Sequence, residues 1–184
     1  MSAWRIFLST KYIVSIFMST LFFSSTSFAA DVILQINGRV LGQSCNVKSS
    51  DLTKNVQFDD LDPKSFTSIG SVSQEQMVTI GLENCTGELP DVTYQFSGEA
   101  DDTNANLLKV TGGGSSTGNL ASGLAIEILD SNKASIPLNQ LQKLNQTIST
   151  ATYDFNFYLR YKSVKPNITA GDASSILYFD IYYE

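Results

Sequence analysis

The sequence contains no histidine, and its only cysteines are Cys45 and Cys85. Without histidine, the chain lacks the general base of Ser–His and Cys–His nucleophile systems and the commonest nitrogen ligand for metals. Two cysteines alone are also too few for the usual four-ligand zinc site. The remaining side chains that cluster in the sequence and could serve acid–base or metal chemistry are carboxylates.

The acidic side chains form two clusters, neither of which has the pattern of a reactive site. Asp59, Asp60 and Asp62 lack the spacing of an EF-hand calcium loop and fit a solvated turn. Asp101 and Asp102 fall in a polar stretch with no predicted cleft for glycoside chemistry. The glycine-rich run 112–118 lacks the Lys-Ser/Thr ending of a phosphate-binding loop. We therefore expect no catalytic residue, no metal and no cofactor.

The N-terminus has the pattern of a secretory signal peptide. Arg5 and Lys11 supply positive charge, an apolar run covers residues 12–23, and small residues occupy positions 27 and 29. The apolar run is shorter than the roughly 20 residues that a membrane-spanning helix needs. We expect cleavage after Ala29 and no membrane insertion.

Removal of residues 1–29 leaves 155 residues, enough for one domain, and changes the formal charge from −6 to −8. An acidic chain is a poor ligand for nucleic acid, since affinity for phosphates comes largely from Lys and Arg. Export also places the protein in an oxidising compartment. There, a pair such as Cys45 and Cys85 favours a disulfide over a thiol site.

Alternation of apolar and polar residues dominates the rest of the chain and indicates half-buried strands with one solvated face. The alternating stretches are residues 92–96, 124–128, 153–161 and 177–183. Turn-rich stretches separate them, and no segment keeps a helical period. This pattern predicts an all-β sandwich or barrel.

Residues 30–41 form one more alternating stretch, placed before the first cysteine. The residues that share its apolar register are Val32, Leu34, Ile36, Gly38 and Val40. Periodicity alone fits two interpretations equally well: the first strand of the sandwich, or a spare strand that precedes it.

Several motifs occur together along residues 30–184. The first are the extension with Asn37-Gly38 and the cysteines of Cys45 and Asn84-Cys85, forty residues apart. The others are the stretches 96–108, 122–138 and 155–158, Gly171 as the fourteenth residue counted back from and including Glu184, and the penultimate Tyr183. This combination resembles the type 1 fimbrial subunit family of the chaperone–usher pathway and is most similar to its minor or adaptor subunits. The Gly/Ser-rich stretch 111–121 is longer than the family's pattern.

The resemblance implies an all-β fold: an incomplete immunoglobulin-like (pilin) β-sandwich that lacks its final strand and carries an N-terminal donor-strand extension. The implied boundaries are a signal peptide at 1–29, the donor-strand extension at 30–41 and the pilin domain at 42–184. A groove would lie beside the C-terminal strand, residues 173–184. A periplasmic pilus chaperone would fill this groove first, and the extension of the next fimbrial subunit would replace it at the outer-membrane usher.

The resemblance also assigns roles to residues. Val32, Leu34, Ile36, Gly38 and Val40 would be the donor strand, with Gly38 fixing its register. Gly171 would lie at the turn that opens the C-terminal strand, and the carboxylate of Glu184 would bind basic chaperone residues. The residues implied for groove, chaperone and subunit contacts are Gly171, Leu177, Phe179, Ile181, Tyr183 and Glu184.

The function that follows is a structural subunit of a fimbria, exported through the periplasm to the cell surface, that polymerises by donor-strand exchange and contributes to cell adhesion. The alternative is a fimbrial adhesin that binds host glycans. Such adhesins resemble two fused domains, whereas here the extension starts directly after the signal peptide. An assembly chaperone would need two domains and basic residues, and a secreted enzyme would have little catalytic chemistry available.

Overall fold

The structure, a computed structural model, describes residues 42–112 and 119–183. These residues form two antiparallel β-sheets, and their only helical elements are two short 3₁₀ turns. The 3₁₀ turns are η1 (Ser49–Asp51) and η2 (Pro63–Ser65). The all-β prediction is confirmed.

The larger sheet has the strand order β1-β2-β8-β5-β4, and β6 also pairs with β5. Its strands are β1 (Ser44–Val47), β2 (Gln76–Thr86), β4 (Leu108–Lys109), β5 (Leu124–Leu129), β6 (Ser135–Ile136) and β8 (Tyr153–Ser163). Its centre is the pair β2 and β8, which stay in register from Gln76 opposite Leu159 to Leu82 opposite Tyr153. These two strands form the longest ladder of the sheet.

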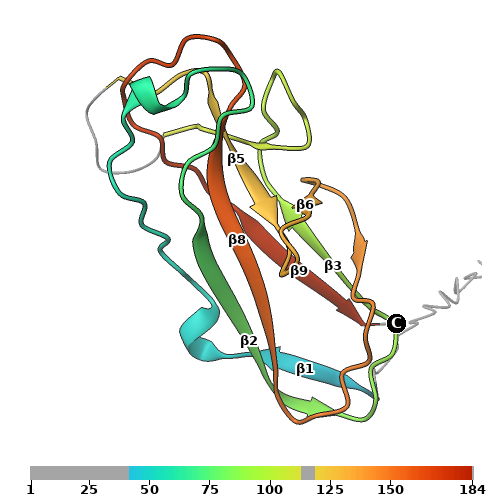
Figure 1. The fold of residues 1–184 in the computed structure, drawn as a ribbon. Coiled ribbons are helices and arrows are strands. Elements are labelled where there is room, and N and C mark those ends of the chain that lie inside the picture. The colour runs from blue at the N-terminus through green and yellow to red at the C-terminus, as the bar shows by residue number, and fades with distance from the viewer. Residues whose placement is uncertain (1–41, 113–118, 184) are drawn as a thin grey trace, which may run out of the picture. The chain divides into compact units, whose positions relative to one another are not determined.

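The smaller sheet has the order β7-β3-β9. Its strands are β3 (Val92–Ser97), β7 (Gln142–Lys143) and β9 (Tyr178–Tyr183). All six residues of β3 pair with β9, from Val92 opposite Tyr183 to Ser97 opposite Tyr178. Figure 1 shows β3 and β9 side by side, with β8 of the larger sheet in front of them. The two sheets pack as the layers of a sandwich.

The core lies between the two sheets and is rich in aromatic side chains. Phe96 of β3 lies edge-on to Phe157 of β8, with ring centroids 4.7 Å apart, and Tyr94 lies 5.6 Å from Phe155. Alternation along β3 and β8 places these rings on the inner faces, as the sequence predicts for both strands. The aromatic contacts therefore join the sheets.

Strand β5 differs from the prediction of one solvated face, because all six of its residues are buried. On its outer face, Ala125 clusters with Leu107 and Val164, and Glu127 is only 3% exposed. Arg160 and Lys162 of β8 bind the Glu127 carboxylate at 2.7 Å each. Long cationic side chains cover the outer face of β5 where the sequence pattern predicted water.

Candidate functional site

Strand β9 is an edge strand, since β3 occupies one side and no strand among the described residues pairs with the other. Its side chains alternate between exposed and half-buried along the whole strand. Phe179, Ile181 and Tyr183 face the core but are only partly buried. An unpaired backbone edge thus lies next to an apolar face that the fold covers incompletely, and such an edge is a template for another strand.

Phe179 connects this edge to the aromatic core. Its ring lies 4.9 Å from that of Phe96 and 5.4 Å from those of Phe155 and Phe157. Leu177, the residue directly before β9, is also half-buried against the core. Leu177, Phe179, Ile181 and Tyr183, singled out in the sequence, therefore lie in one row along the edge.

Tyr183 links the end of β9 to the first strand of the larger sheet. Its hydroxyl donates a hydrogen bond to the Cys45 carbonyl at 3.4 Å. Burial raises the pKa of the Tyr183 phenol, so the hydroxyl keeps the proton that this bond uses. The side chain thus joins the edges of the two sheets at this end of the core.

A second extended segment without a strand partner, residues 53–61, was not found from the sequence. Its residues form no backbone hydrogen bond with any strand in the part of the chain that the structure describes. Phe58 and Leu61 are half-buried against the core, and the ring of Phe58 lies 4.8 Å from that of Tyr161. The segment thus packs half-buried side chains on the same core cluster as β9 while its backbone forms no ladder with a described strand.

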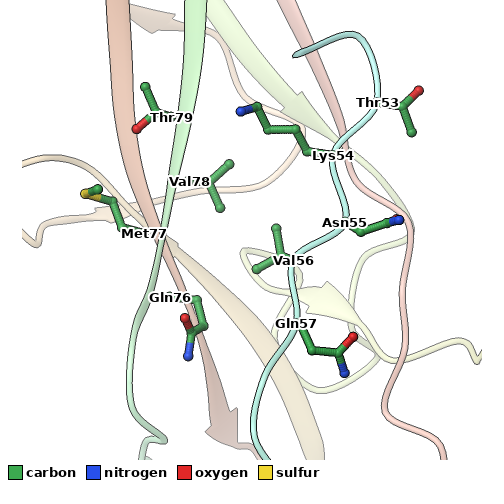
Figure 2. A pocket seen from close by; sticks show the side chains of 9 residues that line it. All are labelled: Thr53, Lys54, Asn55, Val56, Gln57, Gln76, Met77, Val78 and Thr79. Atoms are coloured by element: carbon green, nitrogen blue, oxygen red, sulfur yellow. The ribbon is translucent and has the colours of Figure 1, made fainter. Parts of the chain in front are cut away.

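Residues 53–57 and the first part of β2 line an open hollow of about 430 Å³. Figure 2 shows Val56 and Val78 pointing toward each other across it, while Met77 points away.

Past the end of β1, a side chain takes over the hydrogen bonding of the β2 backbone. A carboxylate oxygen of Asp51 accepts a hydrogen bond from the Gly81 N–H at 2.7 Å. That bond, with help from Lys54, lowers the pKa of Asp51 to about 2.

The C-terminal strand is shorter than the predicted range 173–184, because β9 begins at Tyr178. The preceding residues bond instead to the connection between β4 and β5 of the larger sheet. There, the Ala121 N–H donates to the Asp172 carbonyl at 2.9 Å, and the Thr111 N–H donates to the Ser174 carbonyl at 3.1 Å. These bonds hold the chain away from β3 until it has crossed to the smaller sheet. The strand can begin only after that crossing.

Gly171 lies at this crossing, seven residues ahead of β9. A Cβ at this position would be 2.2 Å from the Asn119 carbonyl oxygen and 2.5 Å from the Ala121 nitrogen. Its φ is outside the positive range that the structure records for four other glycines. Glycine is therefore needed here for close backbone approach.

Cys45 and Cys85 form a disulfide, as the sequence predicted. The bond joins β1 to β2 next to a β-bulge, where the register shifts between Ser44 and Asn46. Asn84, directly before Cys85, has φ +53°, a left-handed conformation that asparagine tolerates better than most residues.

The acidic clusters are surface features. Asp59, Asp60 and Asp62 are exposed, and the Asp62 carboxylate caps η2 by accepting from the Lys64 N–H at 2.9 Å. Asp101 accepts from the Thr103 and Asn104 N–H groups of its own turn. Within residues 42–112 and 119–183, no three His, Cys, Asp or Glu side chains are grouped as metal ligands.

Part of the predicted site lies outside the described residues. This applies to the donor residues Val32, Leu34, Ile36, Gly38 and Val40, to Glu184, and to positions 113–118 of the glycine-rich run. None of the described helices is long and apolar enough to cross a bilayer.

Two antiparallel sheets, a single disulfide and an unpaired C-terminal edge strand define an immunoglobulin-like β-sandwich of the pilin type. A family model described as "Fimbrial protein" matches residues 34–184. The chain belongs to this fimbrial protein family.

The similar proteins are also fimbrial, and they match this chain over most of its length. The chain is 35% identical over 154 residues to the fimbrial-like protein YcbU of Escherichia coli K12, covering 83% of this chain and 84% of YcbU. It is 29% identical to a type-1 fimbrial protein subunit of Serratia marcescens, covering 88% and 91% of the two chains. A chain in the structure of a chaperone–usher pilus superposes with a TM-score of 0.60 at 18% identity, covering 85% of this chain and 97% of that one. The last match supports the fold alone.

Proposed function

We propose that this protein is a structural subunit of a chaperone–usher fimbria and that it polymerises by donor-strand exchange. The observation that carries the proposal is the free edge of β9 beside a half-buried apolar row. Addition of a strand to an exposed sheet edge is a general recognition mode, of which pilin complementation is an example. In that mode the backbone supplies affinity and alternate side chains supply specificity.

The acceptor has two walls in this proposal. Strand β9 is one wall, and the unpaired segment 53–61 is the other. The hydrogen bond from Tyr183 to Cys45 limits how far the two sheets separate at one end. A strand inserted between the walls would pair with unsatisfied backbone groups and complete the core, which removes two causes of aggregation.

The donor in this proposal is the segment 30–41 of a neighbouring subunit. Insertion of Val32, Leu34, Ile36 and Val40 contributes roughly 1.5–3 kcal/mol for each side chain if fully buried, about 6–12 kcal/mol before ordering costs. Gly38 fits where the acceptor is shallow, and a shift of one residue would turn Asp31, Gln35 and Arg39 toward the core. The alternation thereby fixes the register.

The partners and route complete the proposal. A periplasmic chaperone occupies the β9 edge first and holds the Glu184 carboxylate through basic residues. The outer-membrane usher then exchanges the chaperone for the next subunit, and the fibre is displayed on the cell surface. We propose a role in this fibre that is not enzymatic and that contributes to adhesion through the assembled fimbria.

We further propose a minor or adaptor role, supported by the resemblance in stretches 96–108 and 122–138. Counting subunits in isolated fibres by quantitative mass spectrometry tests this role. One or a few copies per fibre is the expected result, whereas many copies along the shaft would contradict it.

The donor role is tested by replacing Val32, Leu34, Ile36 and Val40 with aspartate in the full chain. Fibre assembly, scored by electron microscopy and by the yield of sheared fimbriae, should be lost. The control places uncharged serine in the other register, at Gln35 and Asn37, and should retain assembly. Normal fibres from the first variant would contradict the donor role.

The acceptor role is tested in the same assay by Ile181→Asp, which puts a charge into the half-buried row. Tyr182→Asp is the matched control, because Tyr182 points outward on the same strand. Assembly should fail for the first and persist for the second. Equal assembly of the two variants would contradict the assignment of β9 as the acceptor edge.

A further inference from the structure

The outward face of β9 carries side chains that any strand paired with this edge must lie beside. Tyr178 and Tyr182 are 62% and 45% exposed, and Asp180 lies exposed between them. Adjacent strands are about 4.8 Å apart, so a partner's outward side chains would be cross-strand neighbours of these three residues. Asp180 is the only charged side chain within β9.

The Asp180 carboxylate has a polar neighbour but no cation in the part of the chain that the structure describes. It lies opposite Gln95 and accepts a hydrogen bond from the Ser97 hydroxyl at 3.2 Å. By contrast, Asp154 in the larger sheet pairs with Lys48 at 2.8 Å, and Glu127 binds both Arg160 and Lys162. A negative charge thus remains unpaired at the middle of the free edge.

The rest of the smaller sheet does little to neutralise this charge. Lys143 of β7 is the one cation on its three strands. In the strand register, Lys143 lies opposite Thr93 of β3, and Thr93 lies opposite Tyr182 of β9. Lys143 is therefore two strands away from β9 and in a different cross-strand row from Asp180. The free side of Asp180, toward the missing neighbour, is where a compensating cation would be placed.

We propose that Asp180 selects the partner strand by charge, favouring a strand with Lys or Arg at the outward position beside it and disfavouring one with Asp or Glu. This inference rests on the proposed function, since it requires that a strand pairs with the β9 edge. Opposite charges across an antiparallel pair stabilise it, and like charges destabilise it. The inward apolar residues provide affinity, while Asp180 discriminates among strands with equivalent inward residues.

An outward charge on an edge strand has a simpler use, because it discourages uncontrolled edge-to-edge pairing. That use affects solubility but predicts no preference between partner strands that differ only in outward charge. The two roles are therefore separated by measuring selectivity.

The test uses the full chain with its own donor residues Val32, Leu34, Ile36 and Val40 changed to aspartate, refolded with the disulfide formed. Three peptides of residues 30–41 serve as probes: the natural sequence, a Gln35→Lys/Asn37→Lys form and a Gln35→Glu/Asn37→Glu form. The substitutions leave the inward register unchanged and cover two adjacent outward positions. Affinities are measured by competition against a labelled natural peptide.

We expect the lysine peptide to bind about three- to tenfold more tightly than the glutamate peptide at low salt. The ratio should shrink in 0.5 M NaCl, chosen as a roughly fivefold rise above about 0.1 M, because exposed pairs are screened. Asp180→Asn should bring the ratio close to one, and Asp180→Lys should invert it. The charge-matched control Glu88→Gln, in the exposed turn after β2, should leave the ratio unchanged.

The outcomes separate the two proposals. If no peptide binds, the proposed strand acceptance fails and the selectivity fails with it. If the natural peptide binds but the lysine-to-glutamate ratio is the same in the Asp180→Asn variant, the acceptor stands and the role of Asp180 is overturned.

Discussion

The core of this protein has two unlike sides. Around β4, β5 and β6 the apolar residues are sealed: Ile128 is 1% exposed, and Leu108 and Leu138 are each 2% exposed. Along β1, residues 53–61 and β9 the apolar residues are half-buried against the core, as for Val47 and Ile181. We call these regions the closed side and the open side.

Both sides contain the same kinds of residue, so composition does not explain the difference. On the closed side, both edges of β5 are paired: β8 occupies one edge, and β4 and β6 occupy the other. On the open side, β9 and residues 53–61 each have an edge that no described strand occupies. Backbone pairing, more than hydrophobicity, therefore decides which part of the core is complete.

The largest expected effect concerns the covalent link at the open side. Cys45→Ser with Cys85→Ser should lower the free energy of unfolding by about 4 kcal/mol in the chain-entropy account, for a separation of 40 residues. Chemical denaturation under identical conditions measures it. A loss below about 1 kcal/mol would show that the open side is held mainly by its non-covalent contacts.

On the closed side, Ile128→Ala should cost about 2–5 kcal/mol, because the cavity it leaves is sealed on all sides. The cost should be the same with and without a bound donor peptide, since the residue is already fully buried. A cost that depends on the peptide would mean that the closed side is not independent of the open side.

On the open side, Ile181→Ala should cost about 1 kcal/mol alone and about 2–4 kcal/mol once a donor strand is bound, because burial of the side chain is then completed. Thermal unfolding of both states measures the difference. Leu141→Ala, at an exposed residue next to β7 and not on β9, is the control and should show no such dependence. An equal cost in the two states would contradict the distinction between the sides.

The smallest expected effect is a pH dependence from Asp51, which borders the open side. Its pKa is lowered to about 2, so the stabilisation is complete above its ordinary value of 3.8 and is lost as the pH falls toward 2. Asp51→Asn should flatten the acid-unfolding curve in this window. Asp130→Asn, whose carboxylate caps a turn far along the chain, is a control that should leave the window unchanged.

Much of the fold could be predicted from local alternation. Residues 92–96 and 153–161 form strands β3 and β8 as expected, since alternation is a property of each strand by itself. The two cysteines and the export signal predicted the disulfide. The half-buried row of β9 was also visible in Phe179, Ile181 and Tyr183.

Features that depend on distant parts of the chain could not be predicted. The sequence of β5 gives no sign that Arg160 and Lys162 cover its outer face. Strand β2 breaks its alternation at the bulge near Asn84, which obscured it. Residues 53–61 have too few apolar positions to suggest a wall of the open side, and their unpaired backbone is a property of the assembled sheets.

The position of the disulfide has a mechanical consequence. Tension on the chain ahead of Gly42 enters the folded unit through β1, a strand of only four residues with three paired positions on β2. The bond between Cys45 and Cys85 bypasses that short ladder and passes the load to β2, whose pairing with β8 is the longest ladder among the described strands. A pull on the leading end therefore reaches the centre of the larger sheet through a covalent bond, without depending on the hydrogen bonds of β1.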